Sequence, residues 1–333
     1  MSNIASRFLN LPTINNLKDL SLLMNLSEHF LNQLSRNVDY QYKEVKIKKK
    51  DGSKRLLACP TQRLKAVQAW ILRNILEKLS CDSSATAYIK GYNLKNNAQM
   101  HTGSSFFLCL DIKDFFGTIP QKHVYQLFRA LGYNEHVSII LSNFCCYKGV
   151  LPQGGVTSPI LSNLINIRLD RRIQGYVSKR NITYTRYADD ITLSANNPDK
   201  LIKVKGFVEK IIKNEGYILN ENKARFLRPG NLVKITGLVI STDGSISIGR
   251  KKKRLLRAKI HKLYFDTNLS KLEKDKLSLH INGWFSFLRS IDPDGLNQLK
   301  LYTKKLKQKK IKQKKYKISQ KMNKQKEHQL SIF

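Results

Sequence analysis

The chain has 333 residues, a formal net charge of +36 and an isoelectric point near 10.1. A surface this basic attracts polyanions strongly, so a nucleic acid is the expected partner. The sequence has no apolar run of about 18 residues and no signal-peptide pattern at its start, so we expect a cytoplasmic protein with no membrane partner.

The first predicted elements are short helices and a basic hairpin. Apolar clusters within residues 1–36 predict the helices, and residues 45–55 predict the hairpin. Its Asp51-Gly52 pair suits a tight turn that requires positive φ. Because lysines also protect the exposed edges of ordinary sheets, the basic character alone assigns no function to this hairpin.

Residues 62–79 predict a helix that packs on the core. The apolar residues at helical spacing form one stripe, which consists of Leu64, Val67, Ile71, Ile75 and Leu79. Lys65, Gln68 and Lys78 are predicted to face away from that stripe.

Two later segments bring acidic residues to strand ends. An apolar run, residues 106–110, leads directly into Asp111 and predicts a buried strand. Residues 183–194 predict a β-hairpin whose turn carries Asp189 and Asp190, because Thr, Tyr, Ile and Leu dominate the flanks. An Asp-Asp pair between strands is by itself more often a solvated turn than a catalytic site.

The three carboxylates together indicate a divalent-metal site. If the strand that ends at Asp111 lies beside the hairpin in one sheet, its carboxylate meets those of Asp189 and Asp190. Mg²⁺ suits such a set, because it prefers carboxylate and phosphate oxygens and retains some water. Two Mg²⁺ ions about 4 Å apart can activate an attacking hydroxyl and stabilise a leaving pyrophosphate.

Several sequence blocks resemble, in order, those of reverse transcriptases. Leu110-Asp111 and residues 187–190 (Tyr-Ala-Asp-Asp) look like the catalytic signatures of that family. Residues 151–159, with Leu-Pro-Gln-Gly-Gly and then Thr-Ser-Pro, resemble the loop that lines the nucleotide pocket and template. Residues 216–223 resemble the block that carries a lysine near the triphosphate. The resemblance extends from about residue 46 to residue 237.

The resemblance implies an α+β right-hand polymerase fold with fingers, a ferredoxin-like palm and a helical thumb. It divides the chain into N-terminal helices and fingers (1–105), palm with catalytic site (106–246), thumb (247–302) and basic C-terminal tail (303–333). The residue pattern agrees for the palm. A strand, a helix, the hairpin, a second helix and a closing strand follow one another as in the split βαβ arrangement.

The resemblance also implies the roles of the residues at the chemical centre. Asp111, Ile112, Asp189 and Asp190 would hold two Mg²⁺ ions, with the three aspartates catalytic. Lys223 would assist the departing pyrophosphate by its charge or by donating a proton. The implied reaction is RNA-templated DNA synthesis from deoxynucleoside triphosphates.

A further set of residues would surround the incoming nucleotide. By resemblance, Lys49 and Arg55 of the basic hairpin bind its triphosphate, and Gln153 and Gly154 shape its pocket. Phe116 lies five residues after the first predicted metal ligand, where RNA-templated RNA polymerases have a polar acid that accepts the ribose 2′-hydroxyl. A bulky aromatic ring excludes that hydroxyl by overlap, which predicts deoxynucleotide substrates. A place in the core is the alternative for Phe116.

Two more blocks resemble the retron branch of the family. The segment Asn-Ala-Gln-Met-His, from Asn97 to His101, is similar to its Asn-Ala-x-x-His block, and Ile-Thr-Gly, ending at Thr236 and Gly237, stands where the branch usually has Val-Thr-Gly. These residues are predicted to bind RNA. A helix would place Asn97 and His101 on one face, where they contact a folded RNA or brace the thumb. Alternatively, Asn97 caps a helix and Thr236-Gly237 ends a strand.

Basic segments dominate the C-terminal part. Residues 250–262 predict a basic helix in which Arg250, Lys251 and Lys252 contact RNA, and residues 277–288 predict a second helix whose aromatic residues suit a small core. The lysine-rich run that follows the thumb has too few apolar residues for a domain of its own. Disordered solvation and RNA contact are the two alternatives for this run, and they are compatible because a segment can be disordered until it meets RNA.

These features predict the RNA-directed DNA polymerase of a retron. By resemblance, it uses a structured noncoding RNA as template and as the source of a priming 2′-hydroxyl. It makes branched, RNA-linked single-stranded DNA (msDNA), in antiphage defence with an effector protein. The segment after the thumb is too short for a ribonuclease H domain, so an external ribonuclease H is expected. The alternatives are a group II intron-like or other bacterial reverse transcriptase, and a structural RNA-binding subunit with a vestigial polymerase site.

Overall fold

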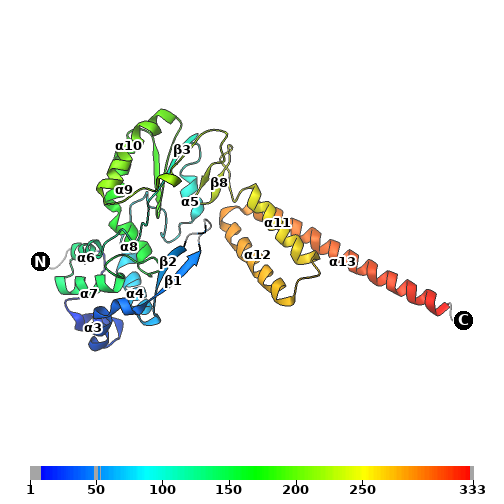
Figure 1. Cartoon of the computed structure of the whole chain (residues 1–333), viewed down its shortest axis with the longest axis horizontal. Helices are drawn as coiled ribbons and strands as arrows, with labels where there is room; N and C mark the ends of the chain where they lie inside the picture. Colours follow the sequence, from blue (N-terminus) through cyan, green and yellow to red (C-terminus); the bar gives the residue numbers. More distant parts are fainter. Residues whose placement is uncertain (1–8, 49–51, 53, 331–333) are drawn as a thin grey trace. The chain divides into compact units, whose positions relative to one another are not determined.

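The structure, a computed structural model, describes residues 9–48, 52 and 54–330. These residues divide into two compact units (Figure 1). The first unit draws on segments 1–92 and 103–231, and the second on segments 93–102 and 232–333.

The N-terminal part of the first unit contains the predicted short helices and the basic hairpin. Helices α2 (Leu17–Met24) and α3 (Glu28–Arg36) each follow a residue whose side chain accepts a hydrogen bond from the first turn. Strands β1 (Tyr42–Lys48) and β2 (Lys54–Pro60) pair antiparallel. Gly52, in their connection, has a φ of 84°, as the predicted tight turn requires.

Helix α4 (Gln62–Asn74) carries Leu64, Val67 and Ile71 of the predicted apolar stripe but is shorter than the predicted helix 62–79. It ends before Ile75, a 3₁₀ turn (Leu76–Lys78) follows, and Leu79 lies beyond that turn. The prediction that Gln68 faces away from the core is wrong. Its Nε2 donates to Tyr42 Oη and to a backbone carbonyl, each at 2.7 Å, and its Oε1 accepts from the Val156 amide at 2.9 Å. Gln68 lies four residues after the first apolar residue of the stripe and therefore on the same face, where an amide is tolerated because its polar atoms are paired.

An antiparallel sheet of four strands lies at the centre of the first unit. Its strands are β3 (Phe106–Asp111), β4 (Thr183–Tyr187), β5 (Asp190–Ala195) and β6 (Arg225–Leu227). They follow the spatial order β4-β5-β3-β6, and Figure 1 labels β3 among them. This is the predicted ferredoxin-like palm, and both the strand that ends at Asp111 and the acidic hairpin are confirmed.

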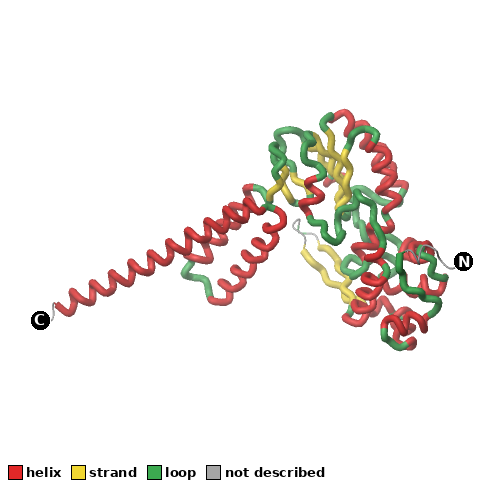
Figure 2. The backbone as a smooth tube through the Cα atoms, turned by 180° about the vertical axis from the view of Figure 1, so that it is seen from behind, coloured by secondary structure: helices red, strands yellow, loops and turns green. Residues whose placement is uncertain are grey.

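Helices cover this sheet and extend the unit (Figure 2). They are α6 (Gln121–Ala130), α7 (Glu135–Cys145), α8 (Ser158–Ile165), α9 (Ile167–Ser178) and α10 (Pro198–Asn214). Helix α9 packs on β4, and α10 packs on β5 and β3. The apolar face of α10, which includes Leu201, Val204 and Val208, is buried and covers one face of the sheet that carries the acidic residues.

The second unit combines a small antiparallel sheet with the thumb helices. Its strands, in spatial order, are β7 (Lys234–Ile235), β8 (Leu238–Ile240) and β9 (Ile246–Ser247). Helix α5 (Leu94–Gln99) contacts β8, β9 and a thumb helix. Segment 93–102, which was expected to belong to the fingers, therefore packs with the C-terminal part of the chain. The four-part division of the chain stays a prediction.

The thumb helices are α11 (Arg250–Phe265), α12 (Lys271–Ile291) and α13 (Pro293–Leu330), which contact one another. The first two confirm the predicted helices. The disordered alternative for the run after the thumb is not observed, because α13 continues to Leu330. Lysine and glutamine, which dominate this run, favour helix, and a helix that grows from a packed one needs no new nucleus. Across the described residues, no helix is both long and apolar enough to cross a membrane.

Candidate active site

The predicted acidic residues meet at one edge of the palm sheet. Strand β3 pairs with β5 in a register that sets Asp111 directly opposite Asp190. The amide of Ile112 donates to the carbonyl of Asp189 at 3.0 Å and ties the turn to the end of the strand. Opposed Cα atoms in antiparallel strands lie about 5 Å apart, so the backbone register alone brings these carboxylates together.

The turn that carries Asp189 is short and strained. Tyr187 pairs with Asp190, which leaves Ala188 and Asp189 to connect the two strands. Ala188 has a φ of 58°, in the left-handed region that favours glycine. Ala188 is also buried, so the surrounding contacts must hold this conformation.

The electrostatics of this edge favour a bound cation. Burial, together with the charge of Asp111, raises the pKa of Asp189. Loss of surrounding water, followed by the charges of Asp189 and Asp111, raises the pKa of Asp190 to about 6, although the Asp190 side chain reaches solvent. Lys223 opposes this charge, with its Nζ 2.9 Å from both carboxylate oxygens of Asp111. Arg55, acting on Asp189, and Arg225, acting on Asp190, also counteract it, yet the pKa values of both carboxyls stay above their ordinary value, so the edge still favours a bound cation.

Within the described part of the chain, no three acidic, histidine or cysteine side chains already form a metal-binding cluster. At the palm edge, Asp111 forms an ion pair with Lys223. The donor set suits Mg²⁺ chemically, because all three carboxylates supply hard oxygen ligands. Coordination by Asp111 requires that Lys223 share or release its carboxylate.

A cavity of about 480 Å³ opens beside the acidic edge. Its lining includes Arg55, Tyr88, Asp111, Ile112, Phe116, Gln153, Asp189 and Lys223. The fold thus brings the residues predicted to contact the metal ions, the triphosphate and the sugar to the wall of one cavity, although these residues come from distant segments of the chain. The volume lies within the range of about 300 to 1,000 Å³ that is typical of small-molecule sites. Asp190 and Gly154 are next to lining residues in the sequence.

Arg55 and Phe116 lie in this lining as the nucleotide-binding prediction requires. The charge of Arg55 acts on Asp189, where it counteracts the rise in that pKa. The half-buried ring of Phe116 packs edge-on against the buried Phe115, with their centroids 5.5 Å apart. Phe115 therefore fixes the ring of Phe116 in the cavity wall.

Sequence reasoning missed Tyr88, which lines the same cavity. Its ring centroid lies 6.4 Å from those of Phe116 and Tyr187, so it bridges the sugar-gate candidate and the hairpin that carries Asp189 and Asp190. Tyr88 has a φ of 62°, an outlier for so bulky a residue. No local signal marks this tyrosine, because tertiary contacts impose its backbone conformation.

Gly154 determines how closely its loop approaches strand β2. It has a φ of 130°, and a Cβ atom there would lie 2.7 Å from the carbonyl oxygen of Ala58. The Ala58 amide donates to the carbonyl of Gln153 at 2.9 Å. A larger residue at position 154 would push the loop from the hairpin that carries Arg55 and would widen the cavity.

Other predicted contacts lie in the second unit, while Lys49 falls outside the described residues. Asn97 and His101 are 1% and 0% exposed. The Nδ2 atom of Asn97 donates to Thr236 Oγ1 at 3.5 Å. Helix α5 actually begins after Asn93, so Asn97 is not its cap. This burial supports the alternative in which the pair braces the thumb and argues against direct RNA contact by these two side chains.

Thr236 and Gly237 form the tight turn between β7 and β8. Their φ values are 46° and 86°, and a two-residue hairpin turn with positive φ at both positions is type I′. A β-branched threonine is unfavourable there. The hydrogen bond from Asn97 offsets part of that cost, so the two retron-like blocks form one structural clasp.

The first turn of α11 uses its basic residues in different ways. Lys252 Nζ donates to the carbonyl of Gly237 at 3.3 Å and lies 5.6 Å from the ring centroid of Trp284. Lys252 is thereby committed to contacts inside the second unit. Arg250 and Lys251 are exposed and remain accessible to a polyanion.

These features agree with a direct comparison of sequences. The sequence model described as "Reverse transcriptase (RNA-dependent DNA polymerase)" matches residues 47–321. The chain therefore belongs to the reverse transcriptase family and is an RNA-directed DNA polymerase with the right-hand polymerase fold.

Its relatives place it in the retron branch of that family. The retron Ec86 reverse transcriptase of Escherichia coli is 41% identical over 302 residues, which cover 90% of this chain and 92% of that protein. The retron Mx65 reverse transcriptase of Myxococcus xanthus is 29% identical over 84% of this chain and 68% of its own length. A solved telomerase from Candida albicans covers 90% of this chain and 68% of its own at 13% identity and a TM-score of 0.49, a likeness too low to add to this assignment.

Proposed function

We propose that this chain copies the structured noncoding RNA of a retron into DNA with two Mg²⁺ ions held at Asp111, Asp189 and Asp190. The observation that carries the proposal is the meeting of these carboxylates beside a cavity of about 480 Å³. Bound ions would supply activation of the attacking hydroxyl and stabilisation of the leaving pyrophosphate. The chain's task is to hold the three carboxylates, with Ile112, at this edge.

Positive charge on both sides of the cavity binds the triphosphate in this proposal. Arg55 contributes from β2, and Lys49, six positions earlier in the sequence, is proposed to act with it. The hydrogen bond with Asp111 raises the pKa of Lys223, so its ammonium stays charged at neutral pH. Lys223 can then offer its charge or a proton to the departing pyrophosphate.

The other wall of the cavity selects the sugar. Phe116 excludes a ribose 2′-hydroxyl by overlap, because Phe115 packs against its ring and restricts its retreat. Gln153 places a half-buried amide beside the nucleotide, and Gly154 holds that loop against β2. Deoxynucleoside triphosphates are therefore the proposed substrates.

The second unit binds the RNA in this proposal. Residues 303–326 contain twelve lysines and no acidic residue, and Arg250 and Lys251 add exposed charge at the start of α11. Such charge binds phosphates without reading sequence. Selection of the cognate RNA therefore depends on a match between the shape of the RNA and that of the protein surface. The Asn97–Thr236 clasp, with His101 and Gly237, maintains the shape of the protein.

The retron relatives support a more specific product and setting. The noncoding RNA provides both template and priming 2′-hydroxyl, and the product is branched, RNA-linked single-stranded DNA. An external ribonuclease H removes template RNA, and an effector protein acts with the complex in antiphage defence in the cytoplasm. Branched priming requires that one 2′-hydroxyl of the RNA be held beside the three carboxylates. A folded RNA that binds in a single orientation can hold it there.

The decisive experiment omits any DNA primer. Purified protein is incubated with the noncoding RNA encoded beside its gene, deoxynucleotides and Mg²⁺, and the product is tested for DNA covalently joined to RNA. We expect RNA-linked DNA with the cognate RNA and none with an unrelated hairpin RNA. Asp189→Asn, which removes one carboxylate charge at nearly constant size, is expected to abolish the product while RNA binding is retained.

The same assay separates the competing functions. If the adjacent RNA yields no linked DNA while ordinary primed templates are copied efficiently, the retron proposal fails and a general or intron-type enzyme is favoured. Wild-type extension by Asp189→Asn would refute the metal site. RNA binding with no synthesis on any template would identify a structural RNA-binding subunit.

A further inference from the structure

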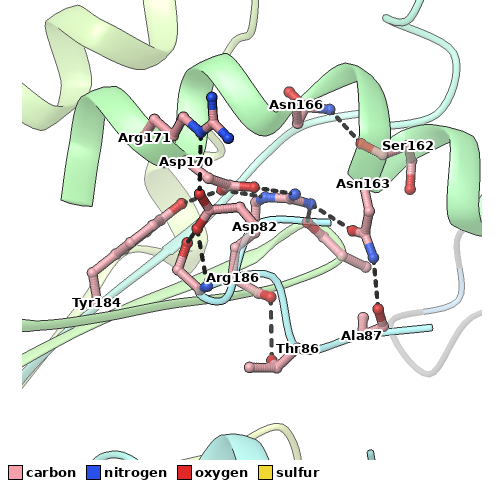
Figure 3. A network of polar contacts seen from close by, with 12 residues as sticks. Asp82, Thr86, Ala87, Ser162, Asn163, Asn166, Asp170, Arg171, Tyr184 and Arg186 are labelled. Atoms are coloured by element: carbon pink, nitrogen blue, oxygen red, sulfur yellow. Dashed lines mark hydrogen bonds and ion pairs between the residues drawn. The ribbon is translucent and has the colours of Figure 1, made fainter. Parts of the chain in front are cut away.

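A buried polar network around Arg186 and Asp170 (Figure 3) contacts the turn that leads to Asp189 and Asp190. Arg186 of β4 and Asp170 of α9 are both fully buried. The guanidinium donates from Nε to Asp170 Oδ1 at 2.8 Å and from Nη2 to Oδ2 at 2.6 Å. Tyr184 Oη also donates to Oδ1, at 2.7 Å. The network therefore joins the helix layer to the strand that leads into the turn.

The third arm of the guanidinium reaches the turn itself. Arg186 Nη1 donates to the carbonyl of Ala188 at 3.2 Å and to Asn163 Oδ1 at 3.3 Å. Asn163 is itself fixed, because its Nδ2 donates to the carbonyl of Ala87 at 2.7 Å (Figure 3). A planar guanidinium has five N–H donors that point in different directions, whereas a lysine ammonium offers three from one atom.

The backbone of Arg186 is held as firmly as its side chain. Its amide donates to the carbonyl of Ser84 at 2.8 Å, and its carbonyl accepts from the Thr86 amide at 2.9 Å. The outer edge of β4 is thus paired immediately before the turn. Main-chain and side-chain contacts together leave the turn little freedom to shift relative to α9.

Stability alone is a poor reason for this arrangement. Removing two charges from water is costly, and an apolar pair of similar volume often stabilises a core as well. An apolar pair could not donate to the carbonyl of Ala188, the residue with a φ of 58° next to Asp189. Unfavourable backbone conformations at functional sites persist because surrounding contacts enforce them.

We propose that Arg186 is a positioning residue of the polymerase reaction. Held by Asp170, Tyr184 and Asn163, it fixes the strained turn so that the two hairpin carboxylates face the metal ions. The inference rests on the proposed metal site and adds a residue that does not touch metal or substrate. It also explains why an arginine immediately before the Tyr-Ala-Asp-Asp segment is buried, in a chain whose other basic residues are mostly at the surface.

The test is Mn²⁺ binding by the full chain without nucleotide, measured by electron paramagnetic resonance of the free ion. Groups that orient metal ligands are worth about 10- to 100-fold in metal affinity. Arg186→Lys retains the charge but cannot reach all acceptors at once, so we expect about a tenfold loss of Mn²⁺ affinity or more. The Mg²⁺ concentration for half-maximal primer extension should rise by a similar factor. Tyr184→Phe removes one hydrogen bond to Asp170 and retains the ring, so a roughly threefold loss is expected.

Controls separate positioning from general destabilisation. Arg172 lies on the same helix as Asp170 but pairs with Glu215, so Arg172→Lys should lower the melting temperature and leave Mn²⁺ affinity at the wild-type value. If Arg186→Lys fails to fold by circular dichroism, the Tyr184→Phe result decides.

Mn²⁺ binding by the Asp189→Asn variant tests the proposed metal site, on which this inference rests, separately from the role of Arg186. Equal Mn²⁺ binding by wild type and Asp189→Asn would refute the metal site itself. If Asp189→Asn loses Mn²⁺ binding while the folded Arg186→Lys and Tyr184→Phe variants keep wild-type affinity, the network is only structural and the inference is overturned.

Discussion

Burial of His101 makes the stability of the second unit depend on pH. Burial lowers the pKa of this imidazole from 6.5 to about 4. In the unfolded chain His101 is protonated as the pH falls below 6.5, whereas in the folded chain it stays neutral down to about pH 4. The free energy of unfolding therefore falls as the pH decreases from 6.5 to about 4. At 1.36 kcal/mol per pH unit, the gap corresponds to about 3 kcal/mol.

Urea unfolding at about pH 7 and about pH 4.5 measures this effect. The chain has two tryptophans, Trp70 in the first unit and Trp284 in the second, so a Trp70→Phe background lets the fluorescence of Trp284 report on the second unit. Adding His101→Gln removes the titrating group. Because other groups titrate equally in both proteins, the difference between their pH dependences isolates His101, and it should be about 2 to 3 kcal/mol. Identical pH dependence would refute the claim that His101 is buried in its neutral form.

Other predictions concern the nucleotide, the metal and the RNA. Phe116→Ala should increase incorporation of ribonucleotides relative to deoxynucleotides in competition assays, and an unchanged ratio in a folded variant would show that the ring is only packing. Because the pKa of Asp190 is raised to about 6, Mn²⁺ binding without nucleotide should weaken as the pH falls through that value, since a protonated carboxyl is a poor ligand, and it should do so much less in Asp190→Asn. Truncation after Lys310 spares the contact of that residue with Tyr264 but removes seven lysines, so RNA binding should weaken and its salt dependence should flatten by about 0.7 log units per log unit of salt for each lost single-strand contact. An unaltered salt slope would show that this part of α13 does not contact RNA.

Sequence pattern was sufficient for the palm because its elements carry strong local signals. The apolar run that ends at Asp111 and the alternating hairpin around Asp189 specify strands, and the motif order specifies their neighbours. The register that sets Asp111 opposite Asp190 follows once both strands bury their apolar faces in one sheet. The residues with the clearest sequence signal are thus those whose positions depend least on distant contacts.

Buried polar residues were not predicted, because their positions depend on contacts with distant parts of the chain. Gln68 was expected at the surface because an amide is polar, yet its three hydrogen bonds make burial acceptable. No sequence pattern near Arg186 predicts that it pairs with Asp170, because the ion pair forms only when α9 packs on β4. Whether a polar side chain is buried depends on partners that local patterns do not contain.

The long thumb helix shows a different limit of sequence reasoning. Low apolar content correctly argues that residues 303–330 cannot build a separate core, but it does not require an irregular backbone. The first turns of α13 pack against α11, and a helix once started can extend through lysine-rich sequence with little further cost. The same composition therefore yields a lysine-rich helix.

The clasp in the second unit changes how the retron-like blocks can act on RNA. Asn97 and Thr236 are 139 positions apart, yet their side chains form a hydrogen bond. The carbonyl of the next residue, Gly237, accepts a hydrogen bond from Lys252 at the start of α11. Contacts thus run from α5 through the β7–β8 turn to the helix that presents Arg250. Phosphate contacts locate a nucleic acid without reading it, so in the proposed function the selection of a folded RNA depends on the fixed spacing of the basic groups that would contact it. Buried residues that set this spacing can define an RNA-binding branch without contacting a nucleotide.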